Sequence, residues 1–171
     1  MTGTNQTISN SAAVQLKKVA NAAFLANPSN CSGAVHDVIK KLVDAQFAYR
    51  QANQLILYLA NPAHGWKQVG LKKASELADQ GKVVVGGMAE PSGHGHVIIV
   101  LPGRWKPAGG YMADGRLMPF VGLFPPAMST ALAPPGHKPW PGAVSDSDKT
   151  VYDPWFNARK FPLVRFWTYD R

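Results

Sequence analysis

The residues best suited to covalent chemistry in this 171-residue chain are its single cysteine, Cys31, and its five histidines. Cysteine attacks as a thiolate, and the N–H groups at a helix N-terminus lower the pKa of a thiol placed there. The capping and turn residues N-P-S-N precede Cys31, and a helical pattern of apolar residues follows it. We therefore predict Cys31 at a helix start. The alternative, which the residues alone leave open, is a buried cysteine with a packing role only.

A cysteine nucleophile needs a base within hydrogen-bond reach. His96 directly precedes the apolar run V-I-I-V-L, so it is predicted at the rigid start of a buried strand and is the preferred base. His94 lies two residues earlier in a glycine-containing turn, where it can line the cleft instead. The remaining histidines are expected to face away from the sulfur or to lie in exposed loops: His36, His64 and His137.

The elements that must position these residues follow from periodicity and turn signals. Helices are predicted over residues 11–26, 31–47, 52–60 and 71–80, the second with the clearest buried face. Strands are predicted over residues 82–87, 96–101, 117–123 and 163–169. Helices come first and strands follow, which indicates an α+β fold.

Length and composition indicate one globular domain, residues 1–171, with 46% hydrophobic residues. Residues 1–10 are expected to be flexible, and they lack the basic and apolar regions of a secretory signal. Residues 102–145 hold nine of the fourteen prolines and are expected to form long loops around short strands. The formal charge of +8 favours an anionic partner. Nucleic acid is not expected, because no zinc finger, aromatic RNA-binding motif or basic arm is present, and no apolar run is long enough for membrane insertion.

Two short motifs carry a resemblance to a known family. Residues 30–35 read N-C-S-G-A-V and residues 95–100 read G-H-V-I-I-V, which resembles the paired signature of NlpC-type, papain-like cysteine peptidases. More narrowly, residues 15–102 resemble the amidase effectors of the bacterial type VI secretion system. That similarity includes Ala52-Asn53, Trp66 and the strand G-K-V-V-V-G before the histidine.

The resemblance implies a papain-like α+β fold, with N-terminal helices and the nucleophile helix packed on a small antiparallel sheet. It implies Cys31 as nucleophile and His96 as base, without a metal or other cofactor. Asn30, Ser32 and His94 would then bind substrate or form the oxyanion hole. Many relatives have a third polar residue that orients the imidazole. Asp114 is the charged candidate here, although an aspartate in a turn more often caps the local backbone, and a backbone carbonyl would also serve.

The function implied is that of a peptidoglycan amidase, a cysteine endopeptidase that hydrolyses the stem peptide or the crosslink. Such an effector is made in the cytoplasm, leaves through the type VI secretion apparatus and acts in the periplasm of a target bacterium. A cognate immunity protein that plugs the active site is the expected partner. One alternative is a papain-like deamidase or acyltransferase acting on a protein or lipid. Another is a basic wall-binding module without catalysis. The cleaved bond and the oligomeric state stay open.

Overall fold

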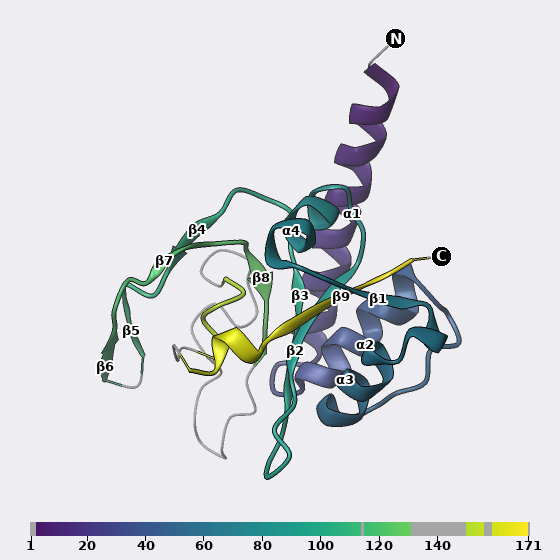
Figure 1. Ribbon diagram of the computed structural model, residues 1–171. Coiled ribbons are helices and arrows are strands. Elements are labelled where there is room, and N and C mark those ends of the chain that lie inside the picture. The colour runs from purple at the N-terminus through teal and green to yellow at the C-terminus, as the bar shows by residue number, and fades with distance from the viewer. Residues whose placement is uncertain (1–2, 114, 131–149, 156–158, 171) are drawn as a thin grey trace.

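The computed structural model describes residues 3–113, 115–130, 150–155 and 159–170. Within these ranges the chain has four α-helices and a five-stranded antiparallel sheet, so the α+β expectation is confirmed (Figure 1). The helices are α1 Gly3–Ala26, α2 Cys31–Leu42, α3 Ala52–Ala60 and α4 Leu71–Asp79, and the short 3-10 turns are η1 Pro62–His64 and η2 Phe161–Leu163.

The sheet has the strand order β1-β9-β2-β3-β8, and each neighbouring pair is antiparallel. Its strands are β1 Trp66–Val69, β2 Val84–Met88, β3 His96–Val100, β8 Ala127–Met128 and β9 Arg165–Tyr169. The late strand β9 lies between β1 and β2, so segments far apart in the sequence are hydrogen-bonded neighbours. At one end of the sheet, His96 pairs with Met88 as β3 begins.

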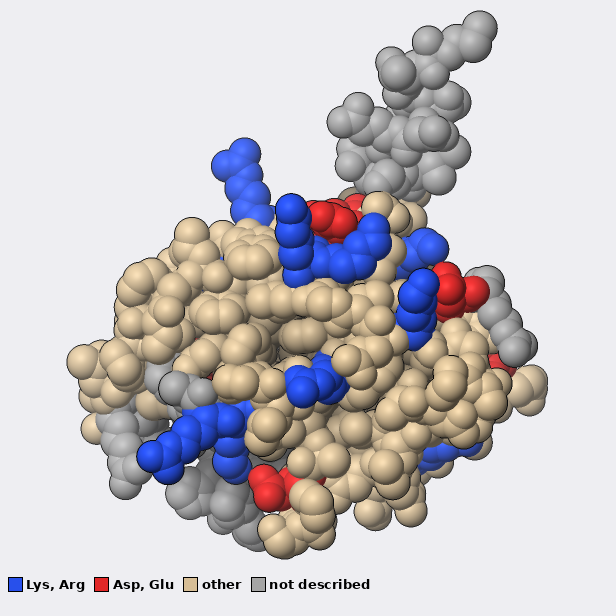
Figure 2. All heavy atoms as spheres, in the orientation of Figure 1, with Lys and Arg blue, Asp and Glu red and all other residues tan. Residues whose placement is uncertain are grey.

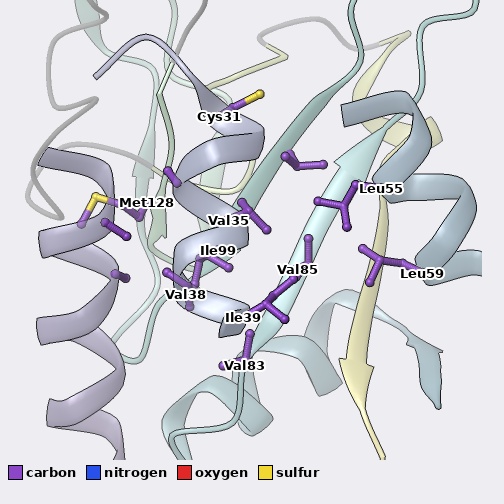
Figure 3. Close-up of a cluster of buried hydrophobic side chains, with 14 of the residues drawn as sticks. Cys31, Val35, Val38, Ile39, Leu55, Leu59, Val83, Val85, Ile99 and Met128 are labelled. Atoms are coloured by element: carbon purple, nitrogen blue, oxygen red, sulfur yellow. The ribbon is translucent and has the colours of Figure 1, made fainter. Parts of the chain in front are cut away.

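Both faces of β2 and β3 are covered, as their near-continuous apolar runs predicted. Side chains of α1, α2 and α3 pack on one face, against Val85, Val97 and Ile99 (Figure 3). Side chains of α4 pack on the other, against Val84 and Ile98. Alternate residues of a strand point to opposite faces, so an apolar side chain at each position buries area on both. This sandwiched sheet is the rigid support from which β3 presents its first residue.

The helix expected over residues 31–47 is correct in its start and wrong in its end. Helix α2 stops at Leu42, and the backbone N–H of Asp44 still donates to the Ile39 carbonyl as the chain turns away. The Asp44 side chain accepts a hydrogen bond from the N–H of Gln46 at 2.9 Å, a local turn that competes with the helix. Phe47 is thereby brought into the core, where it is buried.

The first helix and one strand differ from their expected bounds. Helix α1, expected over residues 11–26, begins at Gly3 and extends away from the body of the molecule (Figure 1). The strand expected over residues 117–123 is divided between β6 Arg116–Met118 and β7 Gly122–Phe124. Pro119 lies between them and has no N–H for a sheet ladder, which explains the break.

The segment after β3 forms two small ribbons in addition to loops. Strand β4, Lys106–Ala108, pairs with β7, and strand β5, Tyr111–Ala113, pairs with β6. Together they make an arm that projects from the side of the molecule away from α3 (Figure 1). The rest of the proline-rich segment, residues 131–149, lies outside the described residues.

On the face drawn in Figure 2, basic side chains are spread over the surface rather than collected in one patch. Figure 2 shows several Lys and Arg side chains near the upper rim of one face, with acidic side chains among them, and others at the lower left. A dispersed positive charge attracts an anionic partner without specifying where it docks. None of the helices in the described part of the chain is long and apolar enough to cross a membrane.

Candidate active site

Cys31 is the first residue of α2, and the residues around it form a defined helix cap. The side chain of Asn30 accepts a hydrogen bond from the backbone N–H of Gly33 at 2.9 Å. A Cβ atom at Gly33 would lie 2.6 Å from the Oδ1 atom of Asn27 and 2.7 Å from the Nδ2 atom of Asn30. The sequence N-C-S-G therefore gives a capped helix start in which only glycine fits at the third helical position.

The sulfur of Cys31 lies at the end of the buried cluster, beyond the turn that carries Val35 (Figure 3). The residue is 8% exposed. Burial raises the pKa of the Cys31 thiol above its ordinary value of 9.0, and this effect exceeds the opposing effect of hydrogen bonds from backbone N–H groups of Val97, Ser32 and Cys31 itself. The thiol is therefore protonated at neutral pH and needs a base to become a nucleophile.

His96 is half-buried at the start of β3 and is held on two sides. Its Nε2 atom lies 2.8 Å from the hydroxyl oxygen of Ser129, the residue directly after β8. The ring of Trp155 packs against the imidazole edge-to-face, with ring centroids 5.5 Å apart. Ser129 is 4% exposed, so this hydrogen bond is shielded from water. Together these contacts fix the plane of the imidazole.

The structure brings Cys31 and His96 to the same cleft, which has a volume of about 430 Å³. The two residues are also linked through the backbone, because one of the N–H groups that favour the Cys31 thiolate belongs to Val97, the residue after His96. Residues from the start of α2, the segment before α3 and the loop before β3 line the cleft: Ser29, Asn30, Cys31, Ser32, Tyr49, Gln51, Ala52, Asn53, Gly93, His94, Gly95 and His96. The predicted substrate-binding residues Asn30, Ser32 and His94 are among them.

The other histidines that the structure describes have contacts away from the sulfur. The Nε2 atom of His36 lies 3.0 Å from the carbonyl oxygen of Phe47. His64 stacks on Tyr58, with ring centroids 3.8 Å apart. His36 thus has the packing role that the sequence allowed for it, whereas His64, expected in an exposed loop, is half-buried against Tyr58. His137 lies outside the described residues, and so does Asp114, the candidate third residue.

Ser129 is the contact that the sequence prediction missed. The sequence pointed to Asp114 as the group that orients the imidazole, whereas Ser129 lies beyond the arm formed by β4 to β7. It reaches the imidazole because β8 pairs with β3, with Met128 opposite Ile99. A two-residue strand has no periodicity of its own, so no local pattern could have shown this pairing.

Asn53 holds the loop that leads into His96. Its Nδ2 atom donates to the carbonyl oxygens of Glu90 at 3.0 Å and Gly93 at 3.1 Å, and its Oδ1 atom accepts from the N–H of Glu90 at 3.0 Å. A Cβ atom at Gly95 would lie 2.3 Å from that same Oδ1 atom. The amide of Asn53 therefore joins the N-terminus of α3 to the loop that carries His94 and His96.

The arrangement has the parts needed for acyl transfer to a thiol. A buried sulfur sits at a helix start, a histidine lines the same cleft, and the first N–H groups of α2 point toward the sulfur. The same N–H groups can stabilise an oxyanion that forms on a carbonyl carbon bonded to that sulfur. No protein-family model matches the chain, and no curated protein matches its sequence.

Proposed function

We propose that this chain is a cysteine amidase with a papain-like fold, in which Cys31 is the nucleophile and His96 the general base. The observation that carries the proposal is the shared cleft, to which α2 contributes the thiol and β3 contributes an imidazole held by Ser129. A cysteine with a packing role only would need neither a second polar residue beside it nor an open cleft above it.

The steps follow ordinary thiol acyl transfer. His96 takes the proton of Cys31, and the thiolate attacks the amide carbonyl to give a tetrahedral oxyanion near the N–H groups of α2. The C–N bond breaks as His96 returns the proton to the leaving amine. A water molecule, deprotonated by His96, then attacks the thioester, and Cys31 leaves with a proton. The result is one hydrolysed amide bond and an unchanged enzyme.

The substrate we propose is the stem peptide or the crosslink of bacterial peptidoglycan. Two observations support it: the motifs N-C-S-G and G-H-V are similar to those of NlpC-type peptidases, and the chain has a formal charge of +8. A positive enzyme is drawn to an anionic wall. As a type VI secretion effector it would act in the periplasm of another bacterium, and its producer would need an immunity protein that blocks the cleft.

The test is digestion of purified sacculi with wild-type protein, Cys31→Ala and His96→Ala, followed by chromatography with mass spectrometry. The proposal expects peptide fragments from wild type only, and their masses identify the bond that is cut. Intact sacculi with a folded, wild-type protein would refute the cell-wall substrate. If Cys31 still reacted readily with a carbonyl electrophile, the chemistry would stand and the substrate would be another amide or ester.

A further inference from the structure

A short chain of hydrogen bonds joins the cap of α2 to Tyr49 at the mouth of the cleft. The Oδ1 atom of Asn30 accepts from the backbone N–H of Gly33 at 2.9 Å and from the hydroxyl of Ser32 at 3.1 Å. The Ser32 hydroxyl oxygen lies 3.2 Å from that of Tyr49. Ser32 is 6% exposed, whereas Tyr49 is 52% exposed and lines the cleft.

The backbone N–H of Gly33 determines which group donates in each hydrogen bond between Gly33 and Tyr49. The N–H of Gly33 can only donate, so Asn30 turns its amide oxygen toward it, and that oxygen can only accept. The hydroxyl of Ser32 has one proton, which it therefore donates to the amide oxygen of Asn30. It follows that Tyr49 donates its own proton to Ser32. The Tyr49 oxygen keeps its lone pairs and presents an acceptor to the cleft.

The aromatic ring of Tyr49 is also held in place. It packs edge-to-face on His36, with ring centroids 5.8 Å apart, and His36 is in turn bonded to the carbonyl of Phe47. Two contacts with α2, to Ser32 and to His36, thus fix the ring while the hydroxyl stays at the cleft. A fixed acceptor loses little conformational entropy when a ligand binds, which increases its value for recognition.

We propose that Tyr49 binds substrate by accepting a hydrogen bond from a backbone amide N–H. Among the described residues that line the cleft there is no Asp, Glu, Lys or Arg, so a neutral amide suits it better than an ammonium group. This inference rests on the proposed function, since the donor belongs to the peptide whose carbonyl Cys31 attacks. It extends the proposed function by assigning Tyr49 as a specificity-determining residue. The cleft then rejects a ligand that lacks the backbone N–H opposite the Tyr49 oxygen.

The test uses dipeptidyl chloromethyl ketones, which label Cys31 whether or not the wall is its substrate. The sulfur displaces chloride to form a thioether, and the thiol proton passes through His96 to solvent. One probe keeps every backbone N–H, and in its partners each N–H is methylated in turn. Wild type should react about tenfold faster with the unmethylated probe at one position, the effect of one hydrogen bond.

The variant Tyr49→Phe should lose that preference while it keeps any steric cost of the methyl group. Only the change in the rate ratio between the two proteins is therefore attributed to the hydrogen bond. Tyr58→Phe is the matched control, because Tyr58 stacks on His64 outside the residues that line the cleft, and it should keep the wild-type ratio. Ser32→Ala frees the Tyr49 proton to point into the cleft, so the preference should fall there too.

The outcomes distinguish a failure of this inference from a failure of the proposed function. Equal ratios in wild type and Tyr49→Phe for every methylated position would overturn the inference, even if sacculi were digested. A ratio lost in Tyr49→Phe with intact sacculi would sustain the inference and refute the cell-wall substrate. Failure of every probe to label Cys31 in folded protein would overturn both.

Discussion

The Nε2 atom of His96 lies 2.8 Å from the hydroxyl oxygen of Ser129, which follows a strand made from a distant part of the chain. Because Ser129 is buried, water cannot replace its hydroxyl without a change in the packing around it. The hydroxyl of Ser129, a neutral group, thus helps to orient the imidazole of His96.

Replacing Ser129 with Ala should lower kcat about tenfold and leave KM unchanged, because the imidazole loses its orientation and the substrate keeps its contacts. Release of peptide fragments from soluble muropeptides measures both constants. Ser129→Thr, which keeps the hydroxyl, should recover part of the rate. Ser75→Ala is the control, since Ser75 is buried in α4 and bonds the indole of Trp105 instead. An equal loss in both alanine variants would indicate a general effect on stability.

The thiol of Cys31 should react slowly at neutral pH once its base is removed. Burial raises the pKa of Cys31 above 9.0, so at any lower pH the folded protein holds less thiolate than a free cysteine does. In His96→Ala, the rate of alkylation by iodoacetamide should rise about tenfold per pH unit and continue to rise beyond pH 9. The same variant unfolded in urea should level off near the ordinary pKa. Levelling below pH 8 in the folded variant would contradict the raised pKa.

Replacing Asn53 with Ala should remove the three hydrogen bonds that hold the loop before β3. We expect a loss of about 1–3 kcal/mol in the free energy of unfolding, together with a lower kcat, because the loop carries His96. Urea denaturation and fragment release measure the two effects. Asn61→Ala is the control: Asn61 caps η1 by accepting from Ala63, so its loss should cost stability and leave the reaction rate unchanged. Unchanged kcat in Asn53→Ala would show that the loop is held by its other contacts.

A Cβ atom at Gly33 should damage the cap of α2. The added carbon would overlap the side chains of Asn27 and Asn30, so Gly33→Ala must displace the cap that sets the start of the helix. We expect a loss of about 1–2 kcal/mol in stability and a lower rate of Cys31 alkylation. Gly70→Ala provides the comparison, because a Cβ atom there meets no other atom within 4 Å. Equal behaviour of the two variants would contradict the steric argument.

The parts of the candidate site that could be predicted are those marked by local patterns. Cys31 stands between capping residues and an amphipathic helix, and His96 stands at the edge of an apolar run, so each position follows from its neighbours. Ser129 and Tyr49 have no such neighbours. One depends on the register between β3 and β8, and the other on the turn after α2, where Asp44 ends the helix early. Both are set by tertiary contacts that periodicity does not encode.

The fold also has features that local patterns predict and features that they do not. The four helices and strands β2, β3 and β9 could be predicted, since each has a clear apolar pattern. The order of the sheet could not, because antiparallel strands with apolar residues on both faces can pair in several arrangements. The division of residues 116–124 between β6 and β7 also depends on which strands they meet, β5 and β4 respectively.

The position of β9 has a consequence for how the chain folds during synthesis. Strands β1 and β2 leave the ribosome long before β9, and the sheet has no continuous set of hydrogen bonds until Arg165–Tyr169 arrives between them. Contacts over such a separation form late and slowly, because the intervening loop must be ordered first. Helix α2 therefore emerges from the ribosome before the sheet on which it packs has all of its strands.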